Sequence, residues 1–247
     1  MSVKEKLTAL ADSIRAKAGT TDLLTLDQMT TTISELKTGG ANEPYTEEEY
    51  DSNGELINVR LYGHNHIRNY AFTNCPNLAL SSLPPGITSI GKYAFQNCSK
   101  LDLTSLPSGV TSIGIYAFVN CPNLALSSLP PGITSIGSYT FRSCSNLALT
   151  SLPPGITSIG MYAFSNCSKL ALTSLPSSVT DIENNAFDNC TSLTTLTFKG
   201  KPSNIRPKAF NMCGRLLTIN VPWAAGEVAN APWGAKNATI NYNYTGE

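Results

Sequence analysis

Charge is the first thing that this sequence lacks. Only 14 % of its 247 residues are charged, whereas a typical globular domain has about 25 %. The 17 basic residues are balanced by 17 acidic ones. Without a basic excess we expect no nucleic-acid partner. No apolar run approaches the ~18 residues of a membrane-spanning helix, so no membrane insertion is expected.

The sequence also lacks the motifs of catalysis and metal binding. It has only two histidines, His64 and His66, and no paired catalytic acid, nucleophile elbow, P-loop or dinucleotide fingerprint accompanies them. No cysteine–histidine spacing fits zinc, and "DSNG" at 51–54 lacks the later ligands of a calcium loop. We therefore expect no enzyme activity, no cofactor and no metal.

A secretory signal is missing as well. The first residues, "MSVKEKLTALADSIRAKAG", contain no continuous apolar segment. The sequence therefore predicts a chain that begins at Met1 and is made in a cytoplasm.

An internal repeat is what the sequence does have. The seven cysteines follow one another at intervals of 23 residues, and one phenylalanine and one leucine column keep the same step. Residues 58–218 hold seven copies of this unit. The cysteines are Cys75, Cys98, Cys121, Cys144, Cys167, Cys190 and Cys213.

Each copy predicts a short series of elements, as in "SLPPGITSIGMYAFSNCSKLAL" at 151–172. The leucines of "LALTSL" alternate roughly as in a half-buried strand, "LPPG" is a turn, and "ITSI" is a second extended piece. "GMYAFSNC" predicts one or two helical turns, with Ile159, Ala163 and Cys167 on the inner side.

One copy alone cannot be stable. Ordering each residue costs about 1–2 kcal/mol of backbone entropy, whereas burying a large apolar side chain returns only about 1.5–3 kcal/mol. Stacked copies would bury both faces of each coil. We therefore predict a solenoid with ladders of identical side chains inside it. The thiols of adjacent coils would point the same way, so the cysteines are expected to be buried and free rather than disulfide-bonded.

The repeat resembles a known family. The pattern L-x-L-T-S-L-P-x-G-[IV]-T-S-I-G-x-Y-A-F-x-N-C-x-x-L, over residues 58–218, is similar to the BspA-like (Treponema-type) leucine-rich repeats of bacterial surface antigens. The resemblance implies a curved, right-handed solenoid that is used for binding, often adhesion, and not for catalysis. The middle copies depart from the usual L-x-x-L-x-L spacing, which "LTTLTF" at 193–198 keeps.

Both ends resemble segments of another group of proteins. "KLTALADSIRAKAGTTDLLTLDQMTTTISEL" and "VPWAAGEVANAPWGAKNATINYNYTGE" are similar to the N-terminal and closing segments of tail-associated proteins from phages and prophages of gut Firmicutes. This resemblance implies a virion protein that leaves the host by lysis.

The predicted organisation has four parts. Residues 1–38 carry two heptad-like apolar stripes, which predict a helical hairpin that attaches the chain to other tail proteins or forms a homo-oligomer. A simple helical cap on the solenoid is the alternative. Residues 39–57 would be a linker and N-terminal cap, and 58–218 the solenoid of short strands and helical turns. Residues 219–247 would form a β cap, with Trp223 and Trp233 over the last coil and "TINYNY" as a final strand.

Two sets of side chains are candidates for a binding surface. Residues before each tyrosine and four positions later are expected to point outward together, as at i and i+4 of a helix; drift at solvent positions is the alternative. They are Lys92, Ile115, Ser138 and Met161 with Gln96, Val119, Arg142 and Ser165. The second set is a tyrosine column, whose flat faces suit sugar or protein recognition unless the rings only pack between coils. It comprises Tyr70, Tyr93, Tyr116, Tyr139 and Tyr162.

These observations predict a non-enzymatic phage tail-associated protein. It would recognise a bacterial surface protein or glycan, or decorate the tail tip, through many weak contacts along the solenoid. A bacterial cell-surface adhesin of the same repeat class is the alternative, and an interaction scaffold inside the bacterium is a third possibility.

Overall fold

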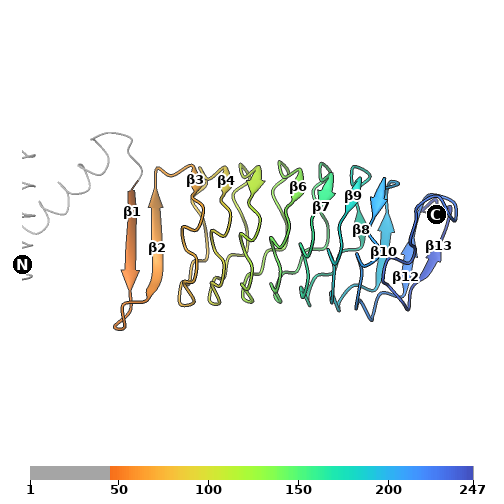
Figure 1. Cartoon of the computed structure of the whole chain (residues 1–247). Coiled ribbons are helices and arrows are strands. Elements are labelled where there is room, and N and C mark those ends of the chain that lie inside the picture. Colours follow the sequence, from red (N-terminus) through yellow and green to blue (C-terminus); the bar gives the residue numbers. More distant parts are fainter. Residues whose placement is uncertain (1–44, 247) are drawn as a thin grey trace, which may run out of the picture. The chain divides into compact units, whose positions relative to one another are not determined.

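The computed structural model describes residues 45–246, which belong to a single unit that begins at Pro44. The helical hairpin predicted for residues 1–38 lies outside the described residues. The copies form coils stacked along one axis, with β1 and β2 at one end and β12 and β13 at the other (Figure 1). The solenoid predicted from the 23-residue period is therefore confirmed.

One side of each coil is a two-residue strand from the "ITSI" piece. Neighbouring strands are parallel and in register, so that Ser89 pairs with Ser112 and Ile90 with Ile113. They form two sheets, with the orders β3-β4-β5 and β11-β9-β7-β6. The strands are β3 (His66–Ile67), β4 (Ser89–Ile90), β5 (Ser112–Ile113), β6 (Ser135–Ile136), β7 (Ser158–Ile159), β9 (Asp181–Ile182) and β11 (Asn204–Ile205).

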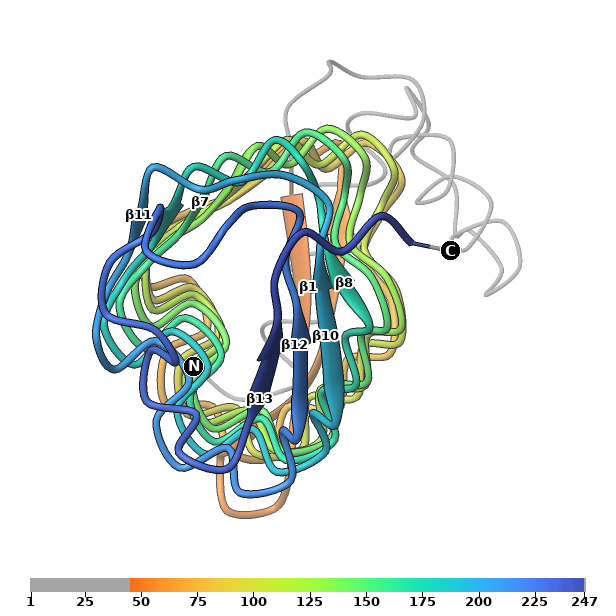
Figure 2. The same cartoon turned by 90° about the vertical axis from the view of Figure 1, so that its right-hand side faces the viewer.

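The opposite side of the coils has a four-stranded sheet near the C-terminal end. Its strand order is β13-β12-β10-β8, and Figure 2 shows these strands side by side, across the coil from β7 and β11. The strands are β8 (Ser174–Leu175), β10 (Thr195–Phe198), β12 (Thr218–Asn220) and β13 (Thr239–Asn241).

Leucine spacing explains why the earlier coils have no strand here. Leu196 and Phe198 are two residues apart and both buried, as the alternation of a strand requires. In the earlier coils the buried leucines are three apart, as in Leu103 and Leu106. Both can point inward only if the chain bows outward between them, and among these segments only Ser174–Leu175, as β8, is paired, beside the regular strand β10.

The helical turns predicted for "GxYAFxNC" are wrong. This segment is a series of turns, and within residues 45–246 no helix is present. The backbone angle φ is +57° at Tyr93 and +60° at Asn97, whereas a right-handed helix needs negative values throughout. The N–H groups of Tyr93, Phe95 and Asn97 donate to carbonyls of the next coil instead of to residues four positions back. Bonding between coils thus replaces bonding within a helix.

A hairpin covers the N-terminal end of the described solenoid. Strands β1 (Tyr45–Tyr50) and β2 (Leu56–Tyr62) pair antiparallel. The turn between them is closed by Asp51, whose carboxylate accepts the N–H groups of Asn53 and Glu55 at 2.8 and 2.9 Å.

The interior contains the predicted ladders. Seven phenylalanine rings from Phe72 to Phe210 stack one on the next, with centroids 5.1–5.6 Å apart. The inward positions expected for Ile159, Ala163 and Cys167 are confirmed, although no helix places them there.

The cysteines are free, as predicted, and six of the seven are buried. Each thiol from Cys98 to Cys213 donates to the carbonyl of the phenylalanine 26 positions earlier, with Sγ to O distances of 2.9–3.1 Å. Burial raises the pKa of Cys98 and of Cys213 to about 12, and it raises the pKa of the four thiols between them well above the ordinary value.

Two tryptophans cover the last coil at the C-terminal end of the solenoid, as predicted from the sequence. The Phe198 ring lies 5.3 Å from Trp223 and 6.0 Å from Trp233, measured between centroids. The Trp233 carbonyl accepts the Phe210 N–H at 2.9 Å, which continues the bonding between coils into the cap. Only "TIN" of the predicted "TINYNY" strand is extended and paired, as β13.

Candidate binding face

The tyrosine column is a continuous stack along the solenoid. Ring centroids of successive tyrosines lie 4.5–5.1 Å apart, and their planes are inclined by 24° or less. Tyr70, at the end of the stack, has 59 % of its surface exposed, and the other four are half-buried.

All five tyrosines occupy left-handed backbone positions, with φ between 53° and 61°. This region costs an ordinary L-residue about 1–2 kcal/mol, whereas asparagine is accepted there more readily. The sixth copy has Asn185 at this position, with φ of 57°. Stacking of each aromatic pair returns about 0.5–1.5 kcal/mol beyond the burial of its area, and Tyr93, Tyr116 and Tyr139 each stack on two neighbours. Stacking therefore offsets the backbone cost of the left-handed conformation.

The tyrosine rings pack between coils, which is the alternative stated from the sequence. Because each tyrosine lies against its neighbours, the faces of Tyr93, Tyr116 and Tyr139 are covered on both sides. The column therefore offers ring edges and hydroxyls rather than flat platforms. Burial raises the pKa of the Tyr116 hydroxyl, and the adjacent tyrosines Tyr139 and Tyr93 add to this.

The residues before the tyrosines lie beside the column, and three of the four are exposed. Lys92 is exposed, Ser138 is half-buried, and Ile115 and Met161 have 36 % and 37 % of their surface exposed. The Tyr139 hydroxyl lies 3.8 Å from the Met161 sulfur.

Glycines fix the spacing at this point of the coil. A Cβ added to Gly114 would lie 2.5 Å from the backbone nitrogen of Lys92. Adjacent coils are therefore in contact through their backbones just before the tyrosines.

Of the residues three positions after each tyrosine, only some lie on the same surface as the column. Arg142 is exposed and Gln96 is half-buried, but Val119 has 3 % and Ser165 1 % of its surface exposed. The predicted outward orientation of Val119 and Ser165 is therefore wrong. The i and i+4 relation does not hold because the left-handed tyrosine between the two positions rotates the chain.

Arg142 joins the tyrosine column. Its guanidinium carbon lies 5.9 Å from the ring centroids of both Tyr139 and Tyr162. We use the name tyrosine face for the surface formed by the four half-buried tyrosines and the exposed side chains beside them. Its residues are Tyr93, Tyr116, Tyr139, Tyr162, Lys92, Ile115, Arg142 and Met161.

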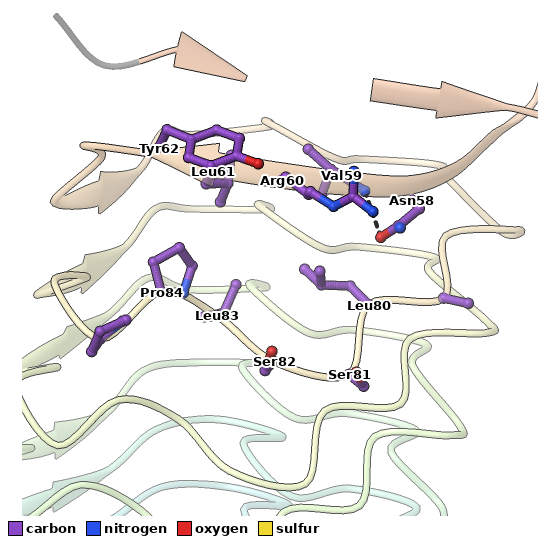
Figure 3. A pocket seen from close by; sticks show the side chains of 12 residues that line it. Asn58, Val59, Arg60, Leu61, Tyr62, Leu80, Ser81, Ser82, Leu83 and Pro84 are labelled. Atoms are coloured by element: carbon purple, nitrogen blue, oxygen red, sulfur yellow. Dashed lines mark hydrogen bonds between the residues drawn. The ribbon is translucent and has the colours of Figure 1, made fainter. Parts of the chain in front are cut away.

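The sequence analysis did not predict a cavity of about 500 Å³ between β2 and the segment 79–85. Residues 58–62 and 79–85 line this cavity (Figure 3). The sequence does contain a signal for this cavity, because the regular strand β2 lies next to a bowed L-x-L-x-x-L segment. The Ala79 N–H donates to the Ile57 carbonyl at 2.9 Å, and the chains diverge beyond that contact. The Val59 N–H donates to the Asn58 side-chain oxygen Oδ1 at 2.9 Å.

A second cavity, of about 430 Å³, contains both histidines. His64 Nε2 lies 3.1 Å from the Thr46 hydroxyl, and His66 Nδ1 lies 2.7 Å from the Asn65 side-chain oxygen. In residues 45–246 no group of three or more histidine, cysteine or acidic side chains could hold a metal ion. The same residues include no helix with the length and hydropathy of a transmembrane segment.

Comparison with known families identifies the repeat. The family model "BspA type leucine rich repeat region (6 copies)" matches residues 65–190 and 149–231, and the two ranges together span more than half of the chain. This chain belongs to the BspA-type leucine-rich repeat family. The leucine-rich repeat resemblance stated from the sequence is thereby confirmed.

Solved leucine-rich repeat structures are similar to this BspA-type chain in fold. A leucine-rich repeat protein of T. pallidum is 21 % identical, with 72 % of this chain and 82 % of that one covered and a TM-score of 0.40. A leucine-rich cell surface protein of Faecalibacterium prausnitzii is also 21 % identical, with 72 % and 70 % covered and a TM-score of 0.45. One from Bacteroides ovatus is 19 % identical, with 81 % and 75 % covered and a TM-score of 0.37. No curated protein sequence matches the chain.

Proposed function

We propose that this chain is a non-enzymatic adhesion protein of a bacterial cell surface that binds its partner through the tyrosine face. Membership of the BspA-type family favours a surface protein over the virion protein that the sequence alone suggested. The observation that carries the proposal is the continuous column of tyrosine edges and hydroxyls with exposed Ile115, Arg142 and Met161 beside it.

The chemistry of the face favours a neutral partner. Between residues 70 and 180 only five side chains are charged, namely Lys92, Lys100, Asp102, Arg142 and Lys169. A row of hydroxyls with Ile115 and Met161 beside it provides hydrogen bonds and apolar contacts, which suits a protein surface or an uncharged glycan. Repetition along the solenoid multiplies weak contacts into useful avidity.

The proposal is tested with the double substitution Tyr116→Asn and Tyr139→Asn. Asparagine accepts the left-handed backbone, so the fold is expected to persist while the hydroxyl row is interrupted. Fluorescent protein is applied to fixed epithelial cells and to intact bacteria, and bound protein is measured by flow cytometry. The matched control is Ser105→Asn with Ser128→Asn, at exposed positions of the bowed segments.

We expect the tyrosine variant to lose most binding and the control to keep it. Equal binding by wild type and both variants would exclude the tyrosine face. Far-UV circular dichroism of each variant verifies the fold.

The phage tail function is a second candidate, because both terminal segments resemble tail-associated proteins. The two functions differ in location. Antibody labelling of the producing bacterium would detect an adhesin on the cell surface, whereas a tail protein would co-purify with induced phage particles. The terminal residues 1–38 would then be the attachment module and would contact other tail proteins.

A further inference from the structure

The two ends of the described solenoid carry opposite charge. Residues 45–62 hold five carboxylates and one arginine, a net charge of −4: Glu47, Glu48, Glu49, Asp51, Glu55 and Arg60. Residues 199–246 hold six basic side chains and one carboxylate, a net charge of +5: Lys199, Lys201, Arg206, Lys208, Arg215, Lys236 and Glu227. Between them, residues 63–198 have five basic and four acidic side chains. The charge is therefore concentrated at the ends.

Most of the basic charge at the C-terminal end is not paired with a described acidic residue. Lys201 pairs with Glu227 at 2.7 Å and Arg206 with Glu183 at 3.5 Å. The other four bases, Lys199, Lys208, Arg215 and Lys236, are exposed, and none of them forms an ion pair with a described residue.

The acidic end is similar. Arg60 lies 3.7 Å from Glu47, while Glu48 and Glu49 accept hydrogen bonds from the neutral Tyr50 and Asn58 side chains. Neither of those two carboxylates forms an ion pair with a described residue.

Both ends also expose apolar side chains and strand edges. Met212 and Leu217, in the last coil, have 66 % and 57 % of their surface exposed, and Tyr50 and Tyr62, on the hairpin, have 53 % and 37 %. Among the described strands, β1 pairs only with β2, and β13 only with β12 (Figure 1). An exposed edge is a site for pairing with another chain. Charge decides which pairing is possible, since two acidic hairpins repel each other, whereas an acidic hairpin and a basic last coil attract.

We propose that copies of this chain associate end to end, with the acidic β1–β2 hairpin of one copy on the basic last coil and cap of the next. The contact joins two different surfaces, so each copy keeps one free end and the assembly grows as a row. A row would repeat the tyrosine face along its length, but the association does not depend on what that face binds.

Charge reversal at each end tests the proposal in the full chain. The acidic-end variant carries Glu48→Lys, Glu49→Lys and Glu55→Lys. The basic-end variant carries Lys208→Glu, Arg215→Glu and Lys236→Glu. A control variant, Lys100→Glu with Lys169→Glu, reverses two charges of the middle coils. Association is measured by sedimentation velocity over a concentration series, at about 0.1 M and about 1 M salt, where the screening lengths are about 10 and 3 Å.

We expect wild type and control to associate at the lower salt and dissociate at the higher. Each reversed variant alone should associate at least about tenfold more weakly, because like charges then meet. An equimolar mixture of the two variants should regain association, since each end of one is then complementary to an end of the other.

Three results would overturn the proposal. Wild type could stay monomeric at every concentration in low salt. Association could survive both reversals, which would place the interface elsewhere, for example in residues 1–38. Wild type could remain monomeric while binding inorganic polyphosphate, which would make the basic end a polyanion site. Unchanged circular dichroism of the variants separates these results from unfolding.

Discussion

The row of buried thiols makes the fold sensitive to alkaline pH. The six cysteines from Cys98 to Cys213 are at most 3 % exposed, and burial raises the pKa of each, to about 12 for Cys98 and Cys213. In the unfolded chain the same thiols ionise near pH 8.5. The stability associated with the neutral buried thiols is therefore complete below about pH 8.5 and is lost as pH rises toward about 12.

The expected loss is large. Each thiol that ionises only in the unfolded chain lowers the free energy of unfolding by about 1.4 kcal/mol per pH unit. Six such thiols give a slope of about 8 kcal/mol per pH unit once the unfolded thiols are ionised. A domain with the usual 5–15 kcal/mol of stability would then unfold within about two pH units above the ordinary thiol pKa.

The assay is denaturant unfolding followed by far-UV circular dichroism at several pH values from about 8 to about 10, with a reductant present. Cys144→Ser with Cys167→Ser removes two titrating thiols and should reduce the slope by about a third, whereas Cys75→Ser, at a half-buried position, should change it less. A free energy of unfolding that is the same at both ends of this pH range would refute the reasoning. So would thiolate absorbance that appears while the dichroism is still native.

Three further outcomes follow from the packing. Gly114→Ala should destabilise the fold by about 1–3 kcal/mol because the added Cβ would lie 2.5 Å from the backbone nitrogen of Lys92. Gly109→Ala should be nearly neutral, because its Cβ would lie 3.8 Å from the nearest atom, the Ile87 carbonyl oxygen. Equal melting temperatures of the two variants would contradict this. Phe118→Ala should cost about 3–5 kcal/mol because its ring stacks on two neighbours, and Phe72→Ala, with one stacked neighbour and 6 % exposure, should cost less in the same denaturant titration. A thiol reagent should modify one cysteine per native chain, Cys75, and all seven after denaturation; rapid reaction of several native thiols would show that the coils open.

Much of the solenoid could be predicted because the repeat has a constant length. Identical residues 23 positions apart must stack in register, so the free cysteines, the phenylalanine stack and the paired "ITSI" strands follow from spacing alone. The tryptophan cap could be expected for a similar reason, since large apolar side chains after the last copy have one exposed core to cover.

The conformation within a coil could not be predicted in the same way. "GxYAFxNC" has the apolar spacing of a helix, but its N–H groups find acceptors in the next coil, and that alternative exists only once coils are stacked. The exposure of Val119 and Ser165 was mispredicted for this reason. The "LALTSL" segment is a strand only at Ser174–Leu175, which pairs with β10, and it forms no strand in the earlier copies.

The sequence by itself determined the register between coils, the composition of the core and the positions that stack as columns, because a fixed period leaves one way to superimpose equal copies. Only the tertiary structure decided which way each side chain points, where Arg142 lies against the tyrosines, and that acidic and basic residues distant in the chain become the two ends of one solenoid. Those properties depend on hydrogen bonds and contacts between coils, which have no counterpart in a single copy.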